Sequence, residues 1–350
     1  MQKILTPRNI LIIVGILAVM IASAVLIKIP LPTIVLSPEI VFHIGNFPVT
    51  NTLIATFLAD IVILVLAFFA TRNMKDVPSG LQNLVEWFVE TFFDMAEDVA
   101  GKSNAKKFFG IFMTLLIFLL VANWMELLPG VDTIGKIEPL EVAYAEAGVT
   151  SGFELRKGIF GIPSLDGAKP IDLTDEQIHE IEEAMAHGDE SHGDGAHHES
   201  AYGGYVLLPY MRGAATDLNV PLALALISVF WTQVIGVQAL GLSYFRKFIM
   251  PPVTGSNSIG MKLIEVFVGI LEIISEFAKI ISFTFRLFGN IFAGAILLFV
   301  MTFLVPFITP VPFYGLEVFV GFMQAFVFAF LTLIFMAMAV ISHDHDSEHQ

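Results

Sequence analysis

One arginine, Arg286, stands in the middle of a long apolar run from Glu272 to Gly294, EIISEFAKIISFTFRLFGNIFAG. Placing an arginine at the centre of a bilayer costs from about 3 to more than 10 kcal/mol, so a charge there indicates a functional site. A guanidinium stays protonated in proteins and cannot relay a proton, but it stabilises a nearby carboxylate in its ionised form. Arg286 is therefore a candidate for holding a carboxylate ionised inside a membrane. The alternative is a buried ion pair that only joins two helices.

On a helix, Arg286 shares one face with polar and small residues, because positions three, four and seven apart align. These residues are Ser275, Lys279, Ser282, Asn290 and Ala293. We expect the opposite face to contact lipid or other helices, because it carries Ile274, Ile281, Phe285, Phe288 and Phe292.

The segment RLFGNIFAG, residues 286–294, with Lys279 and Ser282 before it, resembles the signature of the a subunit of the rotary F-type ATP synthase. Two further segments resemble that family at similar spacing: NWMELLP at 123–129 and RGAATDLN at 212–219. The resemblance implies a stator subunit that carries protons through two half-channels to and from the carboxylates of a rotor ring. It implies no active site for ATP chemistry on this chain and no cofactor.

The resemblance also assigns residues to proton translocation. Arg286 would separate the half-channels, and Lys279 and Ser282 would share its face. The outer half-channel would be lined by Glu126, Asn290, Glu317 and Gln324. The inner half-channel would be marked by Glu265, Glu272 and Glu276, although Glu276 is also spaced to pair with Lys279. Ala295 stands where some members carry an acid or histidine paired with the position of Glu317.

Composition places the chain among membrane proteins. Its 350 residues are 56% hydrophobic and 15% charged, and the mean hydropathy is +0.78, which is too apolar for a soluble domain of this size. The 33 acidic against 18 basic residues argue against a nucleic-acid partner. The absence of cysteine excludes a disulfide framework and thiolate chemistry.

The expected fold is an all-α polytopic membrane protein with one amphipathic interfacial helix. Residues 1–28 would be an N-terminal membrane anchor or a signal peptide, because 9–27 is an uncharged apolar run behind two basic residues. In 29–128 we expect spans at 51–70 and 108–128 and the amphipathic helix at 81–99. In the conducting domain, 218–350, we expect a span at 220–244 and two long helices at 261–304 and 313–342, forming a tilted hairpin that faces the rotor.

Ten basic residues that flank these spans fall on one side, which places the chain ends inside. They are Lys3, Arg8, Arg72, Lys75, Lys102, Lys106, Lys107, Arg246, Lys247 and Lys262. The acidic, histidine-rich insertion at 129–217 would then lie outside. We expect it to be solvated, mobile and dispensable for ion coupling, with a helix near 172–187 capped by Thr174. Its histidines suggest a second function, a secondary metal-ion transporter with a capture loop. The candidate metal ligands, none of them at helical ligand spacing, are His192, His197 and His198.

An intramembrane hydrolase is disfavoured, because the chain has no H-E-x-x-H motif. The expected partners are the c-ring, b-type peripheral stalk subunits, protons and the lipid bilayer. The expected location is the bacterial plasma membrane, which the protein crosses several times.

Overall fold

The computed structural model describes residues 38–157, 163–186, 200–245, 259–305 and 309–341, together with 15, 18–21 and 248. The expected anchor at 9–27 therefore lies mostly outside the described residues, and so do His192, His197 and His198. The chain divides into two compact units. Unit 1 comprises residues up to Thr56, Met125–Thr216 and Ile291–Val320, and unit 2 comprises Phe57–Trp124, Asp217–Asn290 and the chain from Gly321.

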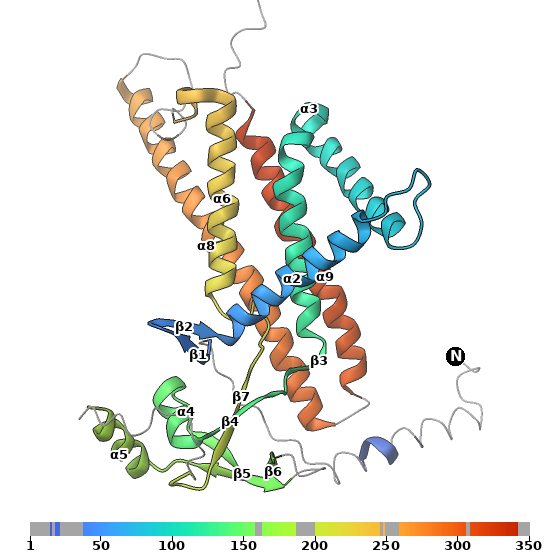
Figure 1. Ribbon diagram of the computed structural model, residues 1–350. Coiled ribbons are helices and arrows are strands. Elements are labelled where there is room, and N and C mark those ends of the chain that lie inside the picture. The colour runs from blue at the N-terminus through green and yellow to red at the C-terminus, as the bar shows by residue number, and fades with distance from the viewer. Residues whose placement is uncertain are drawn as a thin grey trace, which may run out of the picture. The chain divides into compact units, whose positions relative to one another are not determined.

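Within the described ranges, five helices are long and apolar enough to cross a membrane. They are α2 (Asn51–Thr71), α3 (Leu81–Glu126), α6 (Asn219–Leu240), α8 (Ile259–Leu304) and α9 (Pro310–Ala339), shown in Figure 1. The polytopic, predominantly helical class predicted from the sequence is confirmed. α6 is followed by a 3₁₀ turn, η3 (Gly241–Phe245).

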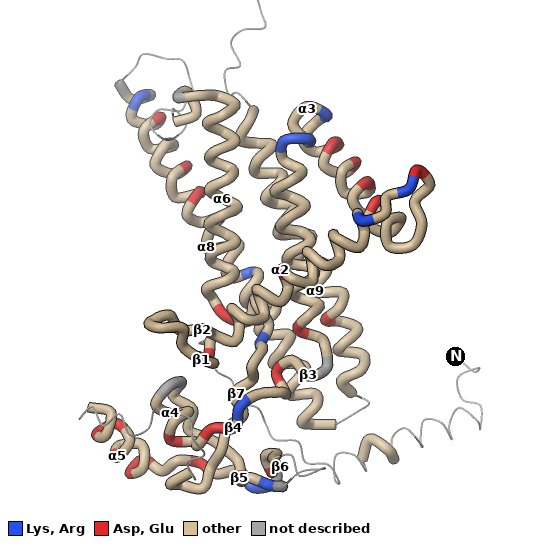
Figure 2. The backbone as a smooth tube through the Cα atoms, in the orientation of Figure 1, with Lys and Arg blue, Asp and Glu red and all other residues tan. Residues whose placement is uncertain are grey.

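The amphipathic helix and the span expected at 81–99 and 108–128 are joined in one element, α3. Its backbone leaves helical geometry only at Gly101, with φ 75° and ψ 156°. A positive φ is accessible to glycine without steric cost, so Gly101 forms the kink between an acidic first part and an apolar second part. Figure 2 shows the acidic residues along that first part. One glycine therefore changes the helix direction between the two predicted elements.

Within unit 2, α8 and α9 run antiparallel, with Phe283 packed 4.8 Å from Phe328 and 5.7 Å from Phe335 between ring centroids. α9 begins at Pro310, three residues before the expected start. Proline is tolerated in the first helical turn, where its missing N–H would have no partner. α6 contacts α9 through a buried hydrogen bond between the Ser228 and Thr332 hydroxyls, 2.7 Å long.

In unit 1, a hairpin of β1 (Ile40–Ile44) and β2 (Phe47–Thr50) leads directly into α2. The insertion contains an antiparallel sheet in the order β4-β7-β5-β6. Its strands are β4 (Gly135–Pro139), β5 (Ser151–Lys157), β6 (Pro163–Asp172) and β7 (Tyr205–Pro209), and β3 (Pro129–Asp132) precedes them.

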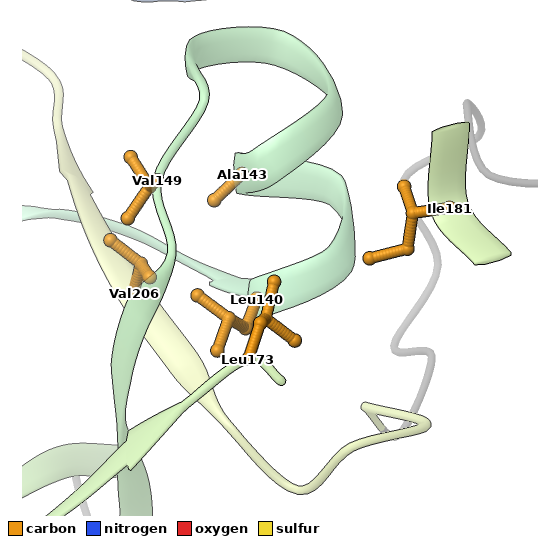
Figure 3. Packing of buried hydrophobic residues seen from close by; sticks show 6 residues of the cluster. All are labelled: Leu140, Ala143, Val149, Leu173, Ile181 and Val206. Carbon is orange, nitrogen blue, oxygen red and sulfur yellow. The ribbon is translucent and has the colours of Figure 1, made fainter. Parts of the chain in front are cut away.

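Two short helices, α4 (Leu140–Ala147) and α5 (Asp175–Ala186), complete the insertion. Six buried residues form its core, seen in Figure 3: Leu140, Ala143, Val149, Leu173, Ile181 and Val206. α5 starts with a reciprocal capping box, because the Thr174 N–H donates to Gln177 Oε1 and the Gln177 N–H donates to Thr174 Oγ1.

The prediction of a solvated, mobile insertion was therefore wrong for its described residues. The acidic composition hid an alternation of buried side chains, such as Val206 and Leu208 on β7, which is the pattern of a half-buried strand. Leu173 and Ile181 belong to the same core as Leu140. Residues 164–186 are consequently part of a folded body and cannot be removed without exposing its core.

Candidate functional site

Arg286 lies on the exposed surface of α8. Most residues predicted to share its face are also exposed, namely Ser275, Ser282, Asn290 and Ala293. Only 17% of the apolar window of α8 is buried, compared with 50% for α3. Within unit 2, no described carboxylate pairs with the Arg286 guanidinium. A charged group on the apolar surface of a membrane helix needs a partner, and the described residues of unit 2 do not supply a carboxylate.

The exposure of Arg286 follows from which side of α8 is buried. Phe283 is 2% exposed and Leu287 is fully buried, because both belong to the stripe that packs in unit 2. Ile281 and Phe285, predicted to lie opposite Arg286, are exposed as well. α8 is covered along only one narrow stripe and leaves both of the predicted faces open, so contact of the opposite face with lipid or other helices stays a prediction.

Two residues predicted for the outer half-channel meet in unit 2. Asn290 Nδ2 donates a 2.7 Å hydrogen bond to Gln324 Oε1. Gln324 is 4% exposed, and its Nε2 is buried without a hydrogen-bond partner among the described residues. An unmet donor of this kind is costly, so its position at a predicted translocation site is consistent with a polar path.

Lys279 and Glu276 form an ion pair one turn apart on α8, with Nζ 3.0 Å from Oε1. The ammonium also lies 4.8 Å from the centroid of the Phe335 ring. This geometry is the local pairing that the spacing allowed for Glu276. Among the other residues predicted for the inner side, Glu265 is buried and Glu272 is half-buried.

Glu317, on the part of α9 in unit 1, is 8% exposed. It is seated against Gly294 of α8, where an added Cβ would overlap the carboxylate. The glycine eight residues after Arg286 thus provides the space that the carboxylate occupies. The sequence motif contained Gly294, but it gave no sign of this contact.

Glu126 ends α3 and is seated in the same way against Gly213, whose Cβ would overlap its carboxylate. Glu126 interacts electrostatically with Asp132, Glu317 and Arg212. The structure therefore brings Glu126 and Glu317, both predicted for the outer half-channel, into one electrostatic group. Arg212 is the cation of that group.

Glu39, just before β1, extends the group. Its Oε2 accepts a 3.0 Å hydrogen bond from Asn51 Nδ2. Burial raises the pKa of Glu39 to about 7, although Arg212 and the Asn51 hydrogen bond lower it. Burial likewise raises the pKa of Asp132 to about 6, opposed by Arg212. Neither Glu39 nor Asp132 stands out in the sequence, because both lie outside the long apolar runs.

Comparisons with known proteins all indicate one family. The family described as "ATP synthase A chain" matches residues 53–337. A protein named "ATP synthase subunit a" from Nitratiruptor sp. is 28% identical over 82% of this chain and 88% of its own length. Proteins of the same name from Moorella thermoacetica and Campylobacter jejuni are 24% and 26% identical, covering 87% and 86% of this chain and 98% and 89% of their own lengths. The chain therefore belongs to the ATP synthase A chain family, with the proton-translocating stator role of that subunit in the F-type ATP synthase.

Proposed function

We propose that this chain carries protons through two half-channels to and from the carboxylates of a c-ring, with Arg286 separating the half-channels. Movement of the ring past Arg286 would couple the proton gradient to rotation and to ATP synthesis in the complex. The observation that carries the proposal is the exposed Arg286 on α8, which has no carboxylate partner among the residues of unit 2 that the structure describes.

The partner of Arg286 in this proposal is a rotor carboxylate. A guanidinium favours the ionised carboxylate and cannot accept or release the proton itself. Each rotor site therefore loses its proton before it passes Arg286 and gains another on the far side. A protonated rotor carboxyl cannot form this ion pair with Arg286, so its passage is unfavourable. The two half-channels therefore stay separate.

The outer half-channel is assigned to Glu126, Glu317, Asn290 and Gln324. Glu317 exchanges protons with the rotor, because it is the buried carboxylate on α9. The inner half-channel is assigned to Glu272 and Glu276, with Lys279 and Ser282 on the Arg286 side of α8. The ion pair of Glu276 with Lys279 means that Glu276 must release Lys279 before it can take up a proton.

The same proposal gives the surroundings of the chain. The acidic first part of α3 is interfacial, residues 218–350 form the conducting domain, and 129–217 lies outside. The b-type peripheral stalk subunits hold the chain against rotation. The bacterial sources of the related proteins support a bacterial plasma membrane.

Cysteine cross-linking tests the proposed partner, since the chain has no cysteine of its own. Ser282→Cys, exposed on the same face of α8 as Arg286, should form a disulfide with a cysteine introduced beside the rotor carboxylate in the assembled complex. Phe283→Cys is the control, because Phe283 is 2% exposed and packs on α9. Equal cross-linking of both variants, or of neither, would contradict the assignment of this face to the ring.

A further inference from the structure

A pocket in unit 1 lies outside the residues assigned to the half-channels. It is a shallow recess of about 10 Å³, roughly the space of one water molecule, and it lies between the residues before and in β1 and the strands β4 and β7. Glu39, Lys136, Glu138 and Tyr210 line it with polar groups. Two carboxylates thus share one small space, with one ammonium beside them.

Glu138 is the more buried of these carboxylates, at 6% exposed. Its Oε1 lies 2.6 Å from Lys136 Nζ, whereas its Oε2 is buried and accepts no hydrogen bond from any described residue. A buried carboxylate oxygen without a donor is unfavourable. In the pocket, this oxygen is available to a hydrogen-bond donor from outside the described residues.

Glu39 faces the same pocket with a pKa of about 7. Burial is the main cause, Asp132 and Glu138 add to the rise, and Arg212 and Asn51 oppose it. A carboxyl group of ordinary acidity is protonated only about once in 500 at pH 7, whereas one with this pKa is protonated about half of the time. Glu39 can therefore both bind and release protons near neutral pH.

The pocket is electrostatically connected to the predicted half-channel. Asp132 and Arg212 act on Glu39, and the same two residues act on Glu126. Asp132 has one buried oxygen, Oδ1, with no hydrogen-bond partner in the described part of the chain. Asp132 and Arg212 therefore link the pocket electrostatically to Glu126 at the end of α3.

We propose that Glu39 and Glu138 form a proton-collecting entrance that supplies Glu126 through Asp132. This inference rests on the proposed function. A proton from the outer solution converts the Glu39 carboxylate to the carboxyl form, in the pocket that Glu39 shares with Glu138. Transfer to Asp132 restores the Glu39 carboxylate, and transfer to Glu126 restores the Asp132 carboxylate. The charge of Arg212 favours the ionised forms of Glu39 and Asp132 after each transfer.

The expected effect depends on the outer pH. Without Glu39 and Glu138, Asp132 remains as the entrance acid, with a pKa of about 6. At pH 8, a group of pKa about 6 is protonated about ninefold less often than one of pKa about 7, but at pH 6 only about twofold less often. The loss should therefore be about fivefold larger at pH 8 than at pH 6.

The test uses the whole reconstituted complex in proteoliposomes with the outer side facing the lumen. ATP synthesis is measured at lumen pH 6 and 8, while a potassium diffusion potential keeps the total driving force equal. In the Glu39→Gln/Glu138→Gln double variant, the ratio of the rate at pH 8 to that at pH 6 should fall about fivefold relative to the unchanged protein. Glu39→Asp alone should keep the original ratio.

Glu154→Gln is the matched control, because Glu154 is an acid of the same insertion that pairs with Lys169 away from the pocket. It should leave the ratio unchanged. An unchanged ratio in the double variant, or an equal loss at both pH values, would overturn the entrance while leaving the proposed function intact. If the unaltered complex makes no ATP from a proton gradient, the proposed function itself fails.

Discussion

Gly294 should be required for proton exchange at Glu317, because the carboxylate occupies the space where a larger residue would place its Cβ. In Gly294→Ala, either the carboxylate or the helix must move by on the order of 1 Å to restore ordinary contact distances. The helix is held by Ile291, which is 4% exposed, so the carboxylate is the part expected to move.

The size of the effect follows from the sensitivity of transfer reactions to geometry. A misplacement of about 1 Å can slow a reaction by about a hundredfold, and an off-rotamer side chain costs about 0.5 to 1.5 kcal/mol. We expect ATP-driven proton pumping in Gly294→Ala to fall between about tenfold and a hundredfold. Assembly should be retained, because only the end of one side chain is displaced.

Dye quenching in inverted membrane vesicles measures this rate. Gly260→Ala is the control on the same helix, because an added Cβ there meets no atom within 4 Å. Gly294→Ala combined with Glu317→Asp should recover part of the rate, since aspartate is one methylene shorter. Normal pumping by Gly294→Ala, or no recovery in the double variant, would refute the role of this contact.

Three further predictions concern other parts of the chain. Gln324→Leu removes a hydrogen bond to α8 worth about 1 kcal/mol and should slow pumping about fivefold, and an unchanged rate would count against a polar path there. Leu140→Ala, at a fully buried position, should destabilise the insertion by about 2 to 5 kcal/mol and speed its proteolysis, whereas Leu155→Ala at an exposed position should not. An impermeant thiol reagent should label Ser103→Cys only from the inner side and Ser164→Cys only from the outer side, and labelling of both from one side would contradict the topology.

The membrane helices were predictable because long apolar runs and their charged ends follow from the cost of burying backbone and charge in lipid. The expected span at 51–70, for example, corresponds to α2, Asn51–Thr71. The sheet of the insertion was missed because its strands are short and carry many charged residues. Gly101 was visible in the sequence, but a positive φ can be recognised only in the folded backbone.

For the candidate site, too, some features were predictable from the sequence and others were not. Arg286 and the residues around it stand out because charge in an apolar run is rare. The sequence did not reveal which side of α8 is covered, since several stripes of a long apolar helix can pack equally well. Glu39 and Asp132 lie far apart in the chain and acquire raised pKa values only through burial in the folded unit.

The function of Arg286 is tested most directly by replacing it and measuring both ATP-driven proton pumping and passive proton conductance in the same vesicles. Arg286→Lys keeps the charge, but a lysine desolvated against the rotor can lose its proton to the passing carboxylate. We expect an assembled complex that pumps no protons. Arg286→Ala removes the barrier between the half-channels, so its membranes should conduct protons passively. Normal coupling in Arg286→Lys would contradict this account, because it would show that the arginine serves only in packing.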